Sequence, residues 1–235
     1  MRVCALRPIH RKIVLVGDAA VGKTALLSIH TAGTFPDDHE PTIFDNYMQE
    51  TWVDGDAFRL SLVDTAGQEA LGAVRSLSYA DTHVVILCFS VDRPETLANA
   101  MTAWSSEIAE LCPGVAILLL ATKCDLREDP AVERALAAKG QHPVTYEEGL
   151  RAAHLMGAQR YVECSAMHDI GVNEVFEQAA RAALDAEPRG ANVIREQKQQ
   201  QRRSRGVSRR LTQRLSTRVS WFVPQAEVVD IRRHT

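Results

Sequence analysis

The sequence predicts an α/β fold built on one six-stranded, mostly parallel sheet with a single antiparallel edge. Short apolar runs alternate with stretches of helical pattern up to about residue 185, as in doubly wound sheets. Asp54-Gly55 separates two strand-like runs, which is a strong hairpin signal and accounts for the antiparallel edge. A glycine-rich turn at residues 17–24 joins the first strand to the first helix.

Each element follows from a local pattern. The expected strands are the apolar runs at residues 12–16, 47–53, 58–63, 84–89, 115–121 and 161–164. Helices are expected at residues 23–30, 94–111, 146–156 and 172–185. Pro94 suits the first turn of its helix, where an N–H has no intrahelical partner, and Thr145 with Glu148 forms a capping box.

Composition restricts the class of protein. Of 235 residues, 46% are hydrophobic and 24% are charged, a balance that can bury a core and excludes wholesale disorder. The longest apolar runs, 84–91 and 115–121, are far shorter than the ~20 residues that cross a bilayer, and no secretory signal is visible. Five widely spaced cysteines without a C-x-x-C pair indicate reduced thiols in the cytosol rather than a zinc or disulfide framework.

The net charge of −3 conceals an acidic body and a basic arm. Residues 1–187 carry 15 Lys and Arg against 27 Asp and Glu, a net −12, whereas residues 188–220 carry ten against one, a net +9. Such a division suggests different partners for the two parts. We expect an N-terminal extension at residues 1–10, a domain at 11–187 and a flexible or amphipathic basic tail at 188–235, beginning at the turn-like Pro188.

A phosphate-binding motif lies between the first strand and the first helix. It matches G-x-x-x-x-G-K-[ST] and reads Gly17-Asp18-Ala19-Ala20-Val21-Gly22-Lys23-Thr24. Backbone N–H groups of this turn and the helix N-terminus can surround phosphate oxygens. Lys23 adds a cation for the β- and γ-phosphates, and the Thr24 hydroxyl can bind Mg²⁺.

Three further motifs follow predicted strands. Asp64-Thr65-Ala66-Gly67-Gln68 places a carboxylate near the metal and a Gln where it can orient a water molecule. In Thr122-Lys123-Cys124-Asp125, the Asp125 carboxylate can accept hydrogen bonds from both N1–H and the amine of guanine, a pattern that adenine lacks. Cys164-Ser165-Ala166 follows the last strand. Each alone is also consistent with an ordinary surface Asp or turn Ser, but together at strand ends they are specific.

These residues resemble the Ras superfamily of small GTPases, a branch of the P-loop NTPases, over about residues 10–186. Residues 38–47 are similar to switch I of the Rho family, and residues 125–146 to the Rho-specific insert helix and its exit. The resemblance implies a small GTPase that binds GTP, GDP and Mg²⁺. It also implies effector proteins that bind the switch I and switch II surfaces, regulation by exchange and activating proteins, and signalling to the cytoskeleton.

The resemblance also implies roles for single residues. Thr24 and Thr42 are the implied Mg²⁺ ligands; Lys23, Thr42 and Gln68 are the implied catalytic residues, with Gln68 positioning the water that an activating protein's Arg helps to use. Phe35 stacks on guanine, Lys123 lines the base, and Ala166 offers its N–H. The implied nucleotide-binding set is Gly17, Asp18, Ala19, Ala20, Val21, Gly22, Lys23, Thr24, Ala25, Phe35, Thr42, Asp64, Gly67, Thr122, Lys123, Asp125, Ser165 and Ala166.

The chain departs from the family at several switch positions. Ala19 replaces the second loop glycine, and its Cβ points toward the γ-phosphate and the space that Gln68 shares with an arginine finger. We therefore expect slow hydrolysis, with a tolerated methyl as the alternative. His39 replaces a Tyr, and Val63 replaces an aromatic residue that helps select an exchange factor. Residues 70–74 lack the Tyr, Asp and Arg that the family carries in switch II.

The basic tail is expected to replace lipid anchoring. The sequence ends without a C-a-a-X box and has no Cys after Cys164, so prenylation is not expected. Acylation of Cys4 stays open beside a bystander thiol. Apolar tail residues recur near helical spacing, as in an interfacial helix on an anionic membrane, with a disordered basic tail as the alternative. They are Val207, Leu211, Leu215, Val219 and Phe222.

The leading interpretation is a GTP-binding switch of the Rho type with slow GTP hydrolysis. The rival is an effector-binding or membrane scaffold module that stays loaded with GTP and turns over little. Ala19 and the altered switch II favour the rival, whereas Gln68 and Thr42 favour a working enzyme. We expect a cytoplasmic monomer, peripheral on the cytosolic face of a membrane. Nucleic acid is not an expected partner, because no recognition module accompanies the basic charge.

Overall fold

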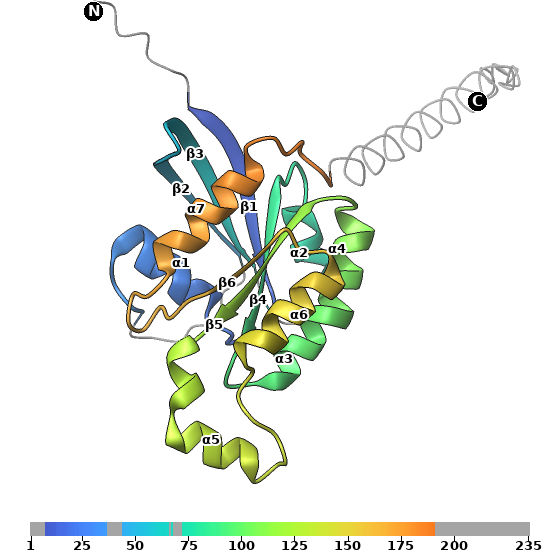
Figure 1. Cartoon of the computed structure of the whole chain (residues 1–235). Helices are drawn as coiled ribbons and strands as arrows, with labels where there is room; N and C mark the ends of the chain where they lie inside the picture. The colour runs from blue at the N-terminus through green and yellow to red at the C-terminus, as the bar shows by residue number, and fades with distance from the viewer. Residues whose placement is uncertain (1–7, 37–43, 66, 68–71, 191–235) are drawn as a thin grey trace, which may run out of the picture. The chain divides into compact units, whose positions relative to one another are not determined.

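One sheet of six strands, in the spatial order β2-β3-β1-β4-β5-β6, organises the chain (Figure 1). The structure is a computed structural model that describes residues 8–36, 44–65, 67 and 72–190. Only β2 and β3 pair antiparallel among these strands; all other neighbours are parallel. The strands are β1 (Ile9–Val16), β2 (Phe44–Val53), β3 (Asp56–Thr65), β4 (Val84–Ser90), β5 (Ala116–Thr122) and β6 (Arg160–Glu163). The predicted fold class is confirmed.

Helices connect the strands. They are α1 (Lys23–Ala32), α2 (Gly72–Ser78), α3 (Pro94–Asn99), the π-helical turn η2 (Ala100–Trp104), α4 (Ser105–Leu111), the 3₁₀ turn η3 (Cys124–Glu128), α5 (Pro130–Ala137), α6 (Tyr146–Met156) and α7 (Val172–Ala183). The helix predicted at residues 94–111 has that extent, but η2 interrupts it. The helix α2 has no counterpart among the predicted elements, and α5 lies where the Rho resemblance implies an insert helix.

Local sequence features explain where three helices begin. The Thr145 hydroxyl accepts the Glu148 N–H at 3.2 Å, and the Glu148 carboxylate accepts the Thr145 N–H at 2.9 Å, so the predicted capping box opens α6. Pro94 occupies the first turn of α3, as predicted. Asp129 is the N-cap residue of α5, because its carboxylate accepts the N–H of Ala131 at 2.7 Å.

The sheet is covered on both faces, so its central strands are buried. Helices α1 and α7 lie on one face, and α3, α4 and α6 lie on the other (Figure 1). Consecutive residues of β1 alternate between the two layers: Ile13 belongs to the buried cluster that includes Phe176 of α7, and Val14 belongs to the cluster that includes Trp104 and Ile108. Such two-sided burial explains the continuous apolar runs of β4 and β5.

The topology brings the sequence motifs to one edge of the sheet. Five strands run parallel, and the loops that follow their carboxyl ends carry the phosphate motif and its companions. The segment after α7 is held against the residues that precede β4. There, Thr82 and Arg189 exchange two backbone hydrogen bonds of 3.1 and 2.8 Å. Within the described residues, no helix combines the length and apolar character that crossing a membrane requires.

Candidate nucleotide-binding site

The loop at residues 17–22 is shaped by positive backbone φ angles. Gly17 has φ 137°, and a Cβ there would lie 2.2 Å from the carbonyl oxygen of Cys88 in β4. Only glycine therefore lets the loop lie this close to the sheet. Ala20 and Gly22 also have positive φ, at 59° and 98°. The loop turns between β1 and α1, with Val21 buried beneath it and Ala19 and Ala20 exposed.

Lys23 lies over the loop that it follows. Its ammonium donates hydrogen bonds of 2.8 Å to the carbonyl oxygens of Gly17 and Asp18. The side chain is buried, and this burial lowers the pKa of the ammonium. The positive group is thus fixed inside the ring of loop residues at the N-terminus of α1, where both the helix dipole and the lysine favour an anion.

A carboxylate and a hydroxyl meet beside the loop. The Thr24 hydroxyl donates a 2.6 Å hydrogen bond to Asp64 Oδ2, and the other carboxylate oxygen, Oδ1, is buried without a hydrogen-bond partner in the described part of the chain. Burial raises the pKa of Asp64, while the bond from Thr24 opposes that rise. Hard oxygen donors of this kind suit Mg²⁺, so the residues fit the predicted metal.

The loop after β3 contacts the phosphate loop through its backbone. A Cβ built on Gly67 would lie 2.3 Å from the Ala19 nitrogen and 2.4 Å from the Asp18 carbonyl carbon. Gly67 therefore lies directly against the position where the chain carries Ala19 in place of a glycine. Gln68 and Thr42, as well as His39 of switch I, lie outside the described residues, so their predicted roles stay predictions.

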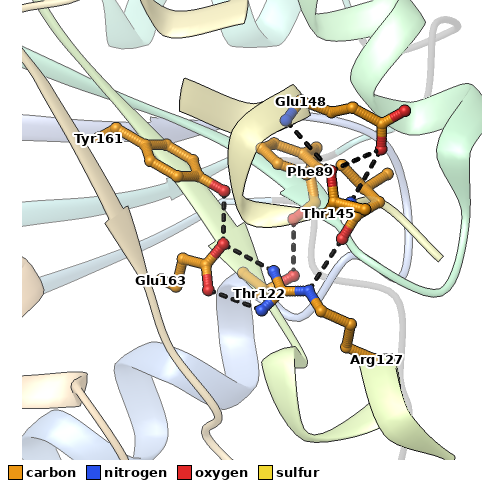
Figure 2. Close-up of polar contacts among 8 residues, drawn as sticks. Phe89, Thr122, Arg127, Thr145, Glu148, Tyr161 and Glu163 are labelled. Atoms are coloured by element: carbon orange, nitrogen blue, oxygen red, sulfur yellow. Dashed lines mark hydrogen bonds and ion pairs between the residues drawn. The ribbon is translucent and has the colours of Figure 1, made fainter. Parts of the chain in front are cut away.

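The end of β5 is joined to the phosphate loop by Thr122. Its hydroxyl lies within hydrogen-bond distance of the carbonyl oxygen of Val21. It also lies 2.8 Å from the carbonyl oxygen of Phe89 (Figure 2). The next residue, Lys123, has a left-handed φ of 55°, and its ammonium lies 3.5 Å from Asp92 Oδ2. Thr122 thus anchors the segment after β5, which carries Asp125, to the loop that precedes α1.

One oxygen of the predicted base-binding carboxylate lacks a hydrogen-bond partner among the described residues. Asp125 Oδ1 is buried and makes no hydrogen bond to any residue that the structure describes. The segment after β5, which carries Asp125, is held to the loop after β6 by a 3.1 Å backbone hydrogen bond from the Cys124 N–H to the Cys164 carbonyl. Buried acceptors without partners are uncommon, and one at this position fits the paired N1–H and amine donors of guanine.

The third motif lies in the loop that follows β6. Ser165 is buried; its hydroxyl accepts the His168 N–H at 3.2 Å, which closes the loop that presents the half-buried Ala166. Ala25 lies in the first turn of α1, and Phe35 is in the segment after that helix. The structure therefore gathers most of the predicted set, while stacking by Phe35 stays a prediction.

An ion pair that the sequence does not signal connects η3, the turn that carries Asp125, to the end of β6. Arg127 follows the Asp125 motif and donates two hydrogen bonds to Glu163, of 2.9 and 2.6 Å, at the end of β6 (Figure 2). The Tyr161 hydroxyl donates to the same carboxylate at 2.6 Å, and Arg127 Nε donates to the Val144 carbonyl at 2.9 Å. The hydrogen bonds to Glu163 raise the pKa of Arg127. Arg127 thereby also holds the exit of the insert segment.

One departure from the family has a structural consequence. Val63 is 1% exposed and belongs to the core beside Val14 and Tyr79. At this position the chain therefore offers almost no surface for an exchange factor to contact. The other departures in switch II give less information, because residues 70 and 71 lie outside the described part and only the backbone of residues 72–74 is described.

Comparison with known proteins agrees with this geometry. A sequence model of the Ras family matches residues 12–185. The GTP-binding protein rho3 of Schizosaccharomyces pombe is 51% identical over 186 residues, covering 78% of this chain and 88% of that protein. RHO3 of Eremothecium gossypii is 49% identical, covering 78% and 88%, and RHO3 of Saccharomyces cerevisiae is 44% identical, covering 80% and 90%.

The fold, the phosphate loop and these relatives define a P-loop GTP-binding protein of the small-GTPase class. The chain belongs to the Rho family of small GTPases. The family resemblance expected from the sequence is thus confirmed, and the chain is a GTPase that binds guanine nucleotides.

Proposed function

We propose that the protein is a Rho-type molecular switch that binds effectors in its GTP state and hydrolyses GTP slowly to GDP. The observation that carries the proposal is Asp125 Oδ1 in the segment after β5, which is buried and has no hydrogen-bond partner among the residues that the structure describes. Its position supports selection of guanine over adenine, because a buried acceptor left unpaired by the wrong base is costly.

At the phosphate end, we propose that Lys23, the loop N–H groups and Thr24 hold the β- and γ-phosphates and Mg²⁺. Two observations support this assignment: the 2.6 Å hydrogen bond from Thr24 to Asp64 Oδ2, and the absence of a hydrogen-bond partner for Asp64 Oδ1 among the described residues. Bound Mg²⁺ supplies charge neutralisation on the phosphates. Thr42, from switch I, would complete the metal site in the GTP state and release it after hydrolysis.

Slow hydrolysis follows from the side chain at Ala19. Gln68 would orient the attacking water, and an activating protein would contribute an Arg in the same space. The Ala19 backbone already contacts Gly67, so an added methyl at residue 19 leaves less room beside the loop that carries Gln68. The same contact favours a second candidate function, a persistently GTP-loaded ligand for effectors with little turnover.

The partners follow from the family and the charge distribution. We propose effector proteins on the switch I and switch II surfaces, with exchange and activating proteins as regulators. The basic tail would hold a monomeric protein on the cytosolic face of an anionic membrane, since its ten Lys and Arg residues at 188–220 oppose a single Glu. The tail from residue 191 on lies outside the described residues.

One experiment tests the proposal and separates the two candidates. Native protein is purified with Mg²⁺, its bound nucleotide is extracted and identified, and reloaded GTP is followed to GDP over time. Slow conversion supports the switch; retention of intact GTP over many hours supports the persistent ligand. Competition that shows equal affinity for ATP and GTP would overturn guanine recognition and, with it, both functions.

A further inference from the structure

Three side chains from the segment after β4 hold two neighbouring residues of the phosphate loop. Asp18 Oδ1 accepts a 2.6 Å hydrogen bond from the Trp104 indole N–H, and Asp18 Oδ2 accepts one of 2.7 Å from the Asn99 amide. Arg93 Nη2 donates to the Ala19 carbonyl at 2.7 Å. Both oxygens of the Asp18 carboxylate are therefore engaged by the same helical segment, and the loop is held from outside the nucleotide-binding side.

The π-helical turn η2 explains how Asn99 and Trp104 reach one carboxylate. The two residues are five positions apart. In an α-helix, five positions leave side chains about 140° apart around the axis. In a π turn, the i→i+5 hydrogen bond places residues five apart one above the other. The interruption of the helix at Ala100–Trp104 is thus what aims both donors at Asp18.

The same indole contacts helix α2. The Arg75 guanidinium lies 4.6 Å from the centroid of the Trp104 ring, a cation–π distance. Arg75 is buried and is fixed by two 2.7 Å hydrogen bonds to Glu107 of α4, whose carboxylate also accepts the Tyr79 hydroxyl at 2.8 Å. Trp104 is 5% exposed and lies between these groups and the phosphate loop.

We propose that Trp104 is a positioning residue that couples helix α2 to the phosphate loop, through Arg75 on its ring and Asp18 on its N–H. A partner that moves α2 then changes how firmly Asp18 and Ala19 are held, and bound nucleotide changes how firmly α2 is held by the same amount. The inference rests on the proposed function, since it assumes that guanine nucleotide occupies the loop.

The first test measures release of a fluorescent GDP from the full chain with Mg²⁺. Trp104→Phe keeps a ring for Arg75 and removes the N–H, so release should accelerate at least about fivefold. Trp52→Phe, at a 68% exposed position of β2, is the matched control and should leave release unchanged. In an Asp18→Ala background, Trp104→Phe should have little further effect on release even where it lowers the melting temperature.

The second test addresses Arg75. Arg75→Gln should speed release in the native background and have a smaller effect in the Trp104→Phe background. A readout independent of nucleotide exchange is the ¹⁵N-resolved indole N–H signal, which should shift for Trp104, and not for Trp52, in both Arg75→Gln and Asp18→Asn.

The outcomes separate this inference from the proposed function. Native protein that fails to retain guanine nucleotide overturns the function and, with it, the assumption made here. If the native protein retains nucleotide and the Trp104→Phe variant releases it at the native rate, the result overturns the coupling and leaves the proposed function intact. Equal effects of Arg75→Gln in both backgrounds also overturn the coupling, because they show that α2 acts on the nucleotide without Trp104.

Discussion

Arg127 and Glu163 form a two-point ion pair, with Nη1–Oε2 and Nη2–Oε1 distances of 2.9 and 2.6 Å, between the turn η3 and the end of β6 (Figure 2). The guanidinium and carboxylate side chains are 25% and 17% exposed, so water screens the pair only partly. This two-point contact joins the turn that carries Asp125 to the strand that precedes Ser165.

Removing the ion pair should loosen the base pocket. We expect Arg127→Ala to lower the free energy of unfolding by about 1–3 kcal/mol, because it leaves the Glu163 carboxylate only partly compensated. GDP release should accelerate by roughly tenfold, measured with a fluorescent GDP. The control is Arg59→Ala, which breaks the more exposed pair with Glu50 and should change both quantities little. Release at the native rate in Arg127→Ala would contradict a role in the pocket.

The phosphate and base motifs were predictable because each is local. Gly17, Lys23 and Asp125 lie in short patterns whose spacing follows from the geometry of a turn between a strand and a helix. The alternation of apolar runs then places those turns at one edge of the sheet, because parallel strands end at the same edge.

The contacts that support the motifs were not predictable in the same way. Arg127 and Glu163 are 36 positions apart, and nothing in either local pattern links them. Ala100–Trp104 has an ordinary helical composition, so the π turn that directs Trp104 to Asp18 leaves no sequence signal. Helix α2 is only seven residues long, too short to establish an amphipathic period.

Guanine selection should depend on the carboxylate of Asp125. Asp125→Asn replaces an acceptor with an amide that donates, so we expect GTP affinity to fall by at least about 100-fold while xanthosine triphosphate gains relative affinity. Competition against labelled GTP measures both changes. Asp185→Asn, at an exposed position near the end of the domain, is the matched control and should bind GTP as the native chain does. Unchanged preference for guanine in Asp125→Asn would contradict the assignment.

Restoring glycine at residue 19 should accelerate hydrolysis. Gly67 lies against the Ala19 backbone, and we expect removal of the Ala19 methyl to leave more room for Gln68 and an activating Arg. We expect Ala19→Gly to raise the intrinsic rate about tenfold, equivalent to ~1.4 kcal/mol, and the stimulated rate more. Single-turnover phosphate release measures both rates.

The matching test uses the predicted water-positioning residue. Gln68→Leu should slow the Ala19→Gly chain more than it slows the native chain, because both residues act on one step. If Ala19→Gly leaves the intrinsic and the stimulated rates unchanged, crowding by the methyl is not the cause of slow turnover.

The contribution of Glu107 to stability should disappear in acid. Burial alone would raise its pKa, but hydrogen bonds from Arg75 and Tyr79 outweigh burial and lower it below its ordinary value of 4.5. Because the folded pKa is the lower one, ionised Glu107 stabilises the fold above about pH 4.5, and this stabilisation is lost as pH falls through the folded pKa.

Urea unfolding at a series of pH values measures this contribution. Glu107→Gln should be less stable than the native chain by about 1–3 kcal/mol at pH 7. The difference should shrink between pH 5 and about pH 3. Glu110→Gln, an exposed neighbour on α4, should follow the native chain at every pH. If the difference in unfolding free energy between the native chain and Glu107→Gln stays constant down to pH 3, the ionised carboxylate is not the group that stabilises the fold.

Membrane attachment should depend on the basic tail. We expect the ten Lys and Arg residues at 188–220 to contribute about 1 kcal/mol each at most on an anionic leaflet, and Trp221 and Phe222 to add apolar insertion. Binding to anionic vesicles should therefore weaken as salt rises, and weaken again in the Trp221→Ala, Phe222→Ala double variant. Sedimentation with anionic and with neutral vesicles measures the partition. The comparison chain ends at residue 190, which keeps the backbone pairing of Thr82 with Arg189. Equal partition of the full and truncated chains on anionic vesicles would exclude the tail and leave acylation of Cys4 or a protein partner.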